Sequence, residues 1–163
     1  MKHLLLSAGL VSLAACTQGG TSDMMEAENL ATVKQIYADF ESGKIDEFIA
    51  ALAPAIVWNE AENNLYAPDS PYIGVEAIMG GVFAPLAQDW EYFSVEPGSF
   101  MSDGDQVAMF GRYKAKYNTS GKTMNPQVVH LWTLQDGKVT AFQQHMDTLA
   151  QKEAMMQEAV IAE

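Results

Sequence analysis

The sequence predicts an α+β domain in which helices come first and a curled antiparallel sheet follows. Its 163 residues suit one domain with a sizeable core. One face of an amphipathic helix is indicated by the spacing of Leu30, Val33, Tyr37 and Phe40. Four strand-like segments then follow, over residues 90–96, 106–117, 123–134 and 138–146, joined by the short turns SDGD, NTSGK and QDGK. Helices followed by a meander give this layout, and a strongly bent sheet wrapped on helices leaves a conical pocket.

A second helix and a first strand are expected between these two halves. Gly43 ends the first helix, because glycine tolerates the left-handed conformation at a helix C-terminus. The second helix is short, and its apolar positions are Ile45, Phe48, Ile49 and Leu52. It stops before Pro54, because proline cannot continue a helix. Residues 55–59 are predicted as a strand, and residues 60–71 as a loop that contains two prolines.

Two further helices complete the prediction. Residues 75–83 have helical apolar spacing that is weakened by Gly80-Gly81. A terminal helix is expected from Thr148 onward, with Leu149, Met156 and Val160 on one face. The three helices before the long strands would lie against the concave side of the sheet.

Composition and charge exclude several classes of partner. The net charge is -12, with nine Lys plus Arg, and Arg112 is the sole arginine. Such a field repels phosphate backbones, so no nucleic-acid binding is expected. It also disfavours electrostatic capture of anionic substrates, and a small hydrophobic or weakly polar molecule is the expected ligand.

The first fifteen residues form a secretory signal pattern, with a basic Lys2-His3 followed by the apolar run LLLSAGLVSLAA. The pattern ends at Cys16, the only cysteine, and resembles a bacterial lipobox, in which the cysteine is lipidated and becomes the mature N-terminus. A plain signal peptide with an incidental cysteine is the alternative. Acyl chains on Cys16 would anchor the protein to a membrane. By resemblance to enterobacterial sorting, Thr17 after the cysteine favours the outer membrane.

Four parts are therefore expected along the chain. They are a signal peptide (1–15), a lipidated cysteine with a flexible tether (16–28), a folded domain (29–150) and a helical tail (151–163). The tether is predicted because TQGGTSDMMEAE contains little apolar surface to bury. The expected location is the bacterial cell envelope, on the periplasmic side of the outer membrane.

Several stretches, taken in order, resemble the SnoaL-like branch of the nuclear-transport-factor-2-like fold. They are VKQIYADFESGKIDEFIAALAPAIVW, YIGVEAI, GSFMSDGDQVAMFGRY and SGKTMNPQVVHLWTLQDGKVTAFQQHMDT. The resemblance implies a SnoaL-like domain over 29–150, with a cone-shaped curved antiparallel sheet wrapped on three N-terminal helices. The superfamily includes ketosteroid isomerase, polyketide cyclases, dehydratases, epoxide hydrolases and many non-enzymatic members, so the fold does not fix the function.

The same resemblance points to two catalytic candidates. Asp147 falls where polyketide cyclases carry an acid/base aspartate, and His130 matches a histidine often found in the preceding strand. The chain departs from the commoner ending at two positions, where Gln143 replaces an arginine and His145 replaces an aromatic residue. Loss of the arginine removes one force that would keep Asp147 ionised.

Strand alternation leaves two faces open for the last strand. One face would carry Gln143, His145 and Asp147. The other would carry Phe142, Gln144 and Met146. The sequence leaves open which face looks inward, because a bulge would exchange the two. Asp147 is a base that moves a proton or the N-cap of the terminal helix, and one residue could serve both roles.

The other candidate ligand-binding residues also have a functional and a structural interpretation. Trp58 and Glu60 stand where the first strand should meet the pocket, or are a packed aromatic and a solvated acid. Tyr113 lines the pocket or pairs across strands. His130 and His145 supply donors to a developing oxyanion, or lie in the sheet and at the pocket rim. No metal is expected, because the histidine spacing matches no ligand motif.

The leading functional interpretation is a lipid-anchored envelope domain with a small-molecule pocket. As an enzyme it would be a cofactor-free isomerase, cyclase or dehydratase that uses Asp147 as acid/base with assistance from His130. One alternative is a non-catalytic module that binds a hydrophobic small molecule. Another is a dimeric interaction domain that uses the convex face of the sheet, and a homodimer is the expected assembly.

Overall fold

The computed structural model describes residues 18–156, so the predicted signal peptide, Cys16 and the end of the predicted tail lie outside the described residues. The helices are α1 Gln18–Glu41, α2 Ile45–Ala50, α3 Val75–Ile78, η1 Met79–Phe83, α4 Ala84–Asp89 and α5 Thr148–Met155. No helix in this part of the chain is long and apolar enough to cross a bilayer.

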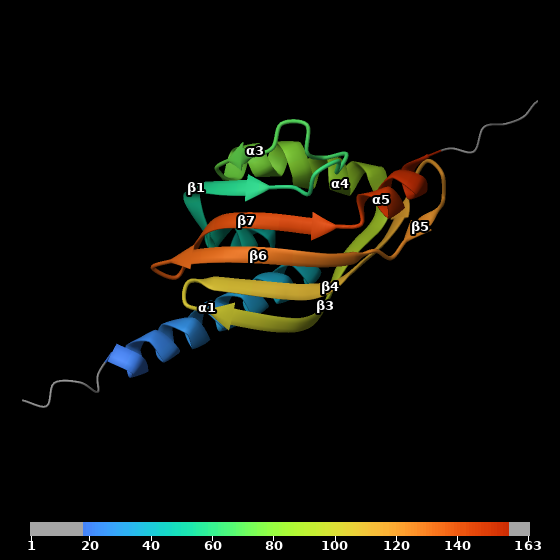
Figure 1. Cartoon of the computed structure of the whole chain (residues 1–163). Coiled ribbons are helices and arrows are strands. Elements are labelled where there is room, and N and C mark those ends of the chain that lie inside the picture. The colour runs from blue at the N-terminus through green and yellow to red at the C-terminus, as the bar shows by residue number, and fades with distance from the viewer. Residues whose placement is uncertain (1–17, 157–163) are drawn as a thin grey trace, which may run out of the picture.

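The strands form one curled, seven-stranded sheet. They are β1 Leu52–Asn59, β2 Tyr72–Ile73, β3 Trp90–Asp103, β4 Gln106–Tyr117, β5 Thr123–Met124, β6 Gln127–Gln135 and β7 Lys138–Met146. Their order is β2-β1-β7-β6-β4-β3, with β5 beside β4 (Figure 1). The α+β prediction is confirmed, but the sheet is mixed, because β1 pairs with β7 in parallel while the other pairs are antiparallel.

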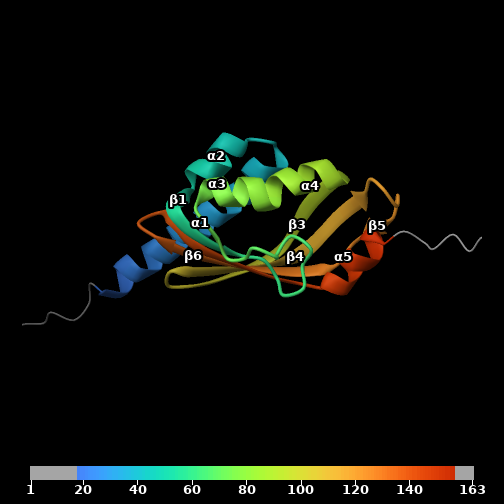
Figure 2. The same cartoon turned by 90° about the horizontal axis from the view of Figure 1, so that it is seen from above.

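The helices before the long strands cover one face of the sheet. Figure 2 shows α1 to α4 on the same side of the curved sheet and α5 at one end, near β5. The buried core lies between these layers and includes Ile36 of α1, Trp132 of β6 and Phe142 of β7. The curvature of the sheet therefore creates a space that the helices close.

Helix α1 begins much earlier than the sequence predicted. Residues 18–28 were expected to be a flexible tether, and they are instead the first half of α1. The hairpin between β3 and β4 holds this half: Ser102 donates a hydrogen bond to Glu26 (Oγ to Oε1, 2.8 Å), and Asn29 donates to the Gly104 carbonyl (3.2 Å). Polar contacts to the hairpin order a segment that has few apolar side chains of its own.

Three strand boundaries also differ from the prediction. β1 begins at Leu52 and runs through Pro54, which stands near the start of the strand, where a missing N–H is tolerated. β3 continues to Asp103, well past the expected end at residue 96. The expected strand over 123–134 is divided into β5 and β6, because Pro126 between them has no N–H to donate to the ladder.

The third predicted helix extends through α3, η1 and α4 to Asp89. The glycines that were expected to weaken it lie in η1, a π-helical turn. A Cβ on Gly81 would lie 2.2 Å from Cε1 of the Tyr72 ring. Glycine at this position therefore lets the helix pack directly on β2.

Candidate functional site

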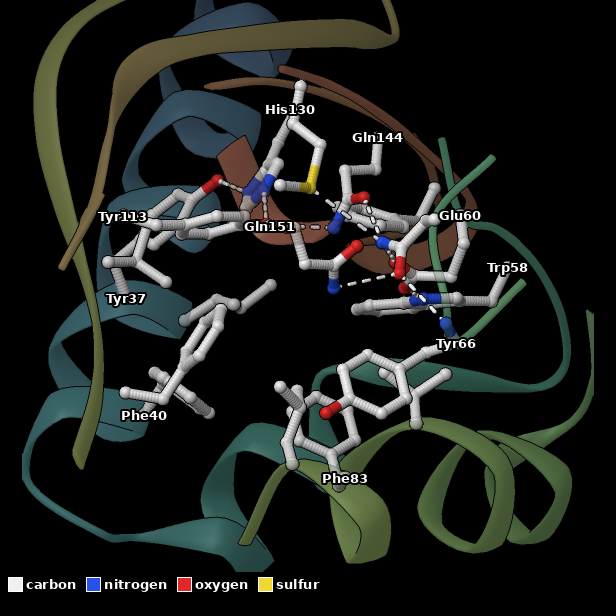
Figure 3. Close-up of a pocket in the computed structure, with 18 of the residues that line it drawn as sticks. Tyr37, Phe40, Trp58, Glu60, Tyr66, Phe83, Tyr113, His130, Gln144 and Gln151 are labelled. Carbon is white, nitrogen blue, oxygen red and sulfur yellow. Dashed lines mark hydrogen bonds between the residues drawn. The ribbon is translucent and has the colours of Figure 1, made fainter. Parts of the chain in front are cut away.

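A mostly apolar cavity lies between the concave face of the sheet and the helices (Figure 3). It contains about 610 Å³ of space not filled by atoms, counting its opening to solvent. Aromatic side chains make up most of its apolar lining, and the stacked rings of Trp58 and Phe142 have centroids 3.7 Å apart. The polar side chains in the lining, apart from tyrosine hydroxyls and the tryptophan N–H groups, are Glu60, Asn64, His130, Gln144 and Gln151.

Glu60 provides a carboxyl group inside this cavity. It follows β1 directly and is 6% exposed. Its two oxygens accept hydrogen bonds from Trp58 Nε1 and Asn64 Nδ2, each 2.7 Å long. Burial raises the pKa of Glu60 to about 7, and the hydrogen bond from Trp58 opposes the rise. A carboxyl with this pKa exchanges its proton near neutral pH.

Three side-chain amides form a hydrogen-bonded group that reaches Glu60 through Asn64, and they are held in fixed orientations. Backbone N–H groups can only donate, so each identifies the amide oxygen that it contacts. Ala61 N–H donates to Gln144 Oε1 (3.3 Å), and Tyr66 N–H donates to Asn64 Oδ1 (2.9 Å). Leu65 N–H donates to Gln151 Oε1 (3.2 Å). The NH₂ group of Asn64 consequently points to Glu60 and to Gln144 Oε1, the latter at 2.7 Å.

His130 lies at the other end of the same hydrogen-bond network and is 4% exposed. Its Nδ1 is 2.8 Å from the Tyr37 hydroxyl, and its Nε2 is 2.6 Å from the Tyr113 hydroxyl. Burial lowers the pKa of His130 to about 3, so the ring is neutral at physiological pH. Burial also raises the pKa of both tyrosines, which keeps their hydroxyls protonated. This end of the cavity therefore offers neutral hydrogen-bonding groups.

Gln144 connects the two ends of the network. Its Nε2 donates to the Tyr113 hydroxyl (2.8 Å), while its Oε1 accepts from Asn64 near Glu60. The sequence had placed Gln144 on one of two possible faces without assigning it a role. The structure brings it into the cavity with Phe142 and Met146.

The other face of β7 lies outside the cavity, and this corrects the prediction for three residues. His145 is exposed, and Gln143 is half-buried and donates to the Gln144 carbonyl (2.8 Å). Asp147 is exposed and caps α5, where its Oδ1 accepts from Leu149 N–H (3.1 Å) and Ala150 N–H (3.3 Å). The capping interpretation of Asp147 thus describes its position, and a role as a base inside this cavity does not fit its geometry.

Four of the sequence-predicted residues do meet in the cavity: Trp58, Glu60, Tyr113 and His130. Tyr37 was recognised only as part of the apolar face of α1, because its spacing gave no sign that its hydroxyl would face a histidine. Asn64 was missed because it stands in a loop without periodicity. Its buried position depends on contacts with β7 and α5 that are distant in sequence.

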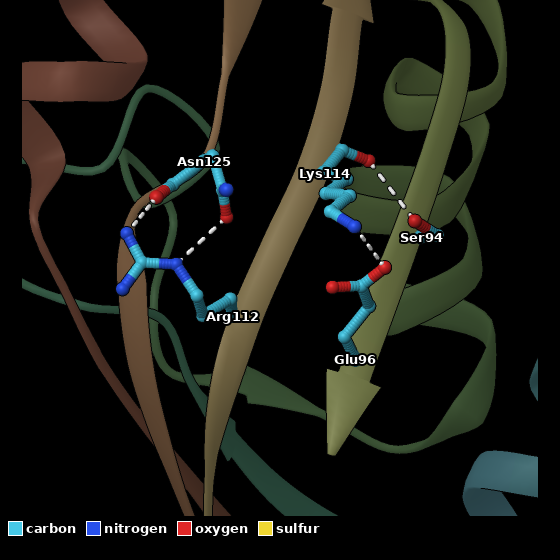
Figure 4. A network of polar contacts seen from close by, with 5 residues as sticks. All are labelled: Ser94, Glu96, Arg112, Lys114 and Asn125. Atoms are coloured by element: carbon cyan, nitrogen blue, oxygen red, sulfur yellow. Dashed lines mark hydrogen bonds and ion pairs between the residues drawn. The ribbon is translucent and has the colours of Figure 1, made fainter. Parts of the chain in front are cut away.

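The lining does not provide the groups that bind phosphorylated cofactors or metals. No lysine or arginine is among the lining residues. Arg112 and Lys114 of β4 instead form polar contacts with Asn125 and Glu96 (Figure 4). Within residues 18–156 no group of three or more His, Cys, Asp or Glu side chains is arranged to hold a metal ion. The chemistry available inside the cavity is proton transfer and hydrogen bonding.

Comparison with known proteins agrees with this architecture. The SnoaL-like domain family matches residues 33–142. An NTF2-like protein from Burkholderia thailandensis E264 shares 30% identity with a TM-score of 0.75, over 78% of this chain and 97% of that chain. TerC, co-crystallised with polyporic acid, shares 25% identity with a TM-score of 0.70, over 78% and 97%.

A third similar structure shows the fold alone. It is a putative SnoaL-like polyketide cyclase from Jannaschia sp. CCS1, which shares 20% identity with a TM-score of 0.70, over 80% of this chain and 93% of that chain. No curated protein matches this chain significantly.

Proposed function

This chain belongs to the SnoaL-like domain family, and on that premise we propose that it is a cofactor-free proton-transfer enzyme of the isomerase or cyclase type. Its substrate is a neutral, largely apolar molecule with a carbonyl group. Glu60 is the base that removes a proton from the carbon next to that carbonyl. The hydroxyl-bearing end of the cavity around His130 stabilises the oxyanion that forms.

One observation carries this proposal: a titratable carboxyl is buried in an apolar cavity and is held at both oxygens. The hydrogen bonds from Trp58 and Asn64 fix the position of the Glu60 carboxylate. The ion pairs found in the described residues, Lys114–Glu96 and Lys116–Glu91, do not involve it. Without a cation to stabilise the charged form, the carboxylate is basic enough to accept a proton near pH 7.

The lining supports a neutral, ring-containing substrate. Aromatic side chains such as Phe40, Phe83 and Trp132 surround the space, and flat apolar molecules pack well against them. The absence of lysine and arginine from the lining disfavours carboxylates and phosphates. TerC, a similar structure, was co-crystallised with polyporic acid. A small-molecule ligand for the present cavity is consistent with that neighbour.

The proposal is tested by hydrogen exchange on a simple ketone. We use 1-indanone, whose C2 hydrogens exchange with deuterium when a base removes them, and follow the loss of their proton NMR signal in D₂O. We expect the full chain to accelerate exchange above the buffer rate. The Glu60→Gln variant loses this acceleration, because an amide cannot accept the proton.

Asp147→Asn is the matched control for this experiment. It also converts an acid to its amide, but at an exposed residue outside the cavity, so exchange should continue at the original rate. Loss of exchange in Asp147→Asn with retention in Glu60→Gln would contradict the assignment of the base. Binding of 1-indanone without any exchange would instead identify a non-catalytic binding module.

Lipid anchoring and assembly are carried forward as separate proposals. Cys16 lies outside the described residues, and we propose that it is acylated and holds the domain at the bacterial cell envelope. Metabolic labelling with a radioactive fatty acid should mark the chain but not its Cys16→Ser variant.

The proposed homodimer would use the outer face of the sheet, where Phe110 is 39% exposed. Sedimentation should then show a dimer that Phe110→Glu dissociates.

A further inference from the structure

The hydroxyl network around His130 contains more hydrogens than it has acceptors. Trp132 Nε1–H donates to the Tyr37 hydroxyl oxygen (2.8 Å), and Gln144 Nε2 donates to the Tyr113 hydroxyl oxygen (2.8 Å). Both directions are fixed. An indole nitrogen can only donate, and the Gln144 amide is oriented by Ala61 N–H. Neither tyrosine can therefore direct its own hydrogen toward these two partners.

Only the two contacts with His130 remain for the tyrosine hydrogens. A neutral imidazole has one N–H donor and one bare nitrogen acceptor. The contacts at Nδ1 and Nε2 each require one hydrogen. Three hydrogens are present: the imidazole N–H and the two tyrosine O–H groups. One tyrosine hydrogen therefore has no acceptor among the hydrogen bonds found in residues 18–156, whichever tautomer His130 adopts.

The lengths of the two contacts favour one tyrosine hydrogen as the one left over. The contact between Tyr113 and Nε2 is 2.6 Å, which is shorter than the usual range for an N–H donor to oxygen. The contact between Tyr37 and Nδ1 is 2.8 Å, within the N–H range. This difference favours the arrangement in which Tyr113 donates to Nε2, while the hydrogen of His130 is on Nδ1 and is donated to Tyr37. The Tyr37 hydroxyl hydrogen is then left without an acceptor.

We propose that His130 is a positioning residue whose Nδ1–H form directs the Tyr37 hydroxyl hydrogen into the cavity, where it binds one carbonyl oxygen of the ligand. Tyr37 is one of the residues that line the cavity, where a ligand would bind. This inference rests on the proposed function and specifies how the carbonyl is recognised. It also gives His130 a role that does not require it to gain or lose a proton.

Selectivity follows from the number of donors. Because the Tyr37 hydroxyl hydrogen lacks an acceptor, the site favours a ligand with a single acceptor oxygen at this position over the same hydrocarbon without oxygen. A net hydrogen bond between neutral groups corresponds to about a five- to tenfold gain in affinity. 1-Indanone should therefore bind about five- to tenfold more tightly than indane, which has the same rings and no oxygen.

The tautomer is measured first, because this experiment requires no ligand. Nitrogen-15 NMR of the full chain with labelled histidine distinguishes a protonated ring nitrogen from a bare one. The His130 signals are assigned through their contacts with the rings of Tyr37 and Tyr113. We expect Nδ1 to be protonated and Nε2 to be bare. Protonation at Nε2, or at both nitrogens at neutral pH, would overturn the proposal.

Ligand binding is measured next with a matched pair of variants, Tyr37→Phe and Tyr113→Phe. Each removes one hydroxyl from His130 and leaves one buried N–H donor, of Trp132 or Gln144, without its acceptor. The two variants should therefore lose similar stability. Tyr37→Phe removes the hydrogen that the ligand would accept and should abolish the preference for 1-indanone over indane, whereas Tyr113→Phe keeps that hydrogen, removes the contact that sets the tautomer, and should reduce the preference by less.

The infrared carbonyl stretch of bound 1-indanone provides a second readout. It should shift to lower frequency in the wild type and should lose this shift in Tyr37→Phe. Equal or undetectable binding of the two compounds to the wild type overturns the proposal, as does loss of the preference in Tyr113→Phe alone. Failure of Glu60 as a base would leave these tautomer and binding results unchanged, so the two proposals fail separately.

Discussion

Each end of the cavity buries one titratable group to a similar degree, but only one of the two groups can exchange its proton near neutral pH. Glu60 is 6% exposed and His130 is 4% exposed, and burial favours the neutral form of each. Glu60 contacts N–H donors, which cannot act as acceptors and which stabilise its charged form. His130 contacts hydroxyls, which donate or accept as required and therefore satisfy a neutral ring. One end is suited to exchanging protons near pH 7, and the other to staying neutral.

The largest expected effect comes from removing the proton acceptor. Glu60→Gln should reduce the exchange of 1-indanone by about 100-fold or more, the lower end of what general base catalysis contributes. In the wild type the exchange rate should rise with pH and level off above about pH 7, because Glu60 must be ionised to act as a base. A profile that levels off near pH 4.5 would mean that burial does not control this carboxyl.

The pH dependence of stability separates the two ends. As pH rises from 4.5 to 7, unfolded Glu60 loses its proton before the folded residue does, so its contribution destabilises the fold. Between pH 3 and 6.5, His130 is protonated in the unfolded state but neutral in the folded state. Its contribution therefore stabilises the fold as pH rises. Between pH 4.5 and 6.5 the two contributions oppose each other.

Glu60→Gln should uncover the contribution of His130. The free energy of unfolding of the variant, relative to the wild type, should increase by about 2–3 kcal/mol between pH 4.5 and 6.5. Urea denaturation at several pH values measures this difference, and other titrating groups cancel in the comparison. A difference that stays constant with pH would show that Glu60 has an ordinary pKa in the folded protein.

The connection between the two ends is tested by two neighbouring glutamines. Gln144→Met leaves Ala61 N–H and an Asn64 N–H without their acceptor, which should cost about 1–3 kcal/mol of stability. Gln143→Met makes the same substitution on the other face of β7 and should change stability by about 0.5 kcal/mol or less. Equal losses in thermal denaturation would mean that the cavity network does not depend on Gln144.

A smaller effect than that of Gln144→Met is expected at Asp147, the residue that the sequence proposed as catalytic. Asp147→Ala removes the cap of α5 and should cost about 1 kcal/mol of stability. Exchange of 1-indanone should remain unchanged, because Asp147 lies outside the cavity. Denaturation and exchange measured on the same preparation would separate the structural role from a catalytic one.

The sequence predicted most of the fold because its signals were local. The turns SDGD and QDGK and the ending of α1 just before Gly43 each depend on a few adjacent residues, and the structure has positive φ at Gly43, Gly104 and Gly137. The parallel pairing of β1 with β7 had no local signal, because it joins strands about eighty residues apart. The hydrogen bonds that Glu26 and Asn29 of α1 make with the β3–β4 hairpin likewise join residues that are distant in sequence.

The candidate site was predicted less well, because it depends on which face of β7 looks inward. Alternation correctly grouped Gln144 with Phe142, but it did not show which group faces the cavity. The family resemblance pointed to Asp147 of the opposite group. Glu60 follows a strand that was predicted to meet the pocket, and it lies in the cavity lining. Its burial also requires Asn64, whose position no pattern in the sequence fixes.

The central claim, that Glu60 is a base with a pKa near neutrality, is tested most directly by titrating its carboxyl group. Carbon-13 NMR of the glutamate-labelled full chain, with Glu60→Gln to assign the signal, gives the midpoint of this titration without a substrate. The account predicts a midpoint at about pH 7. A midpoint near 4.5, the ordinary value for glutamate, would contradict it.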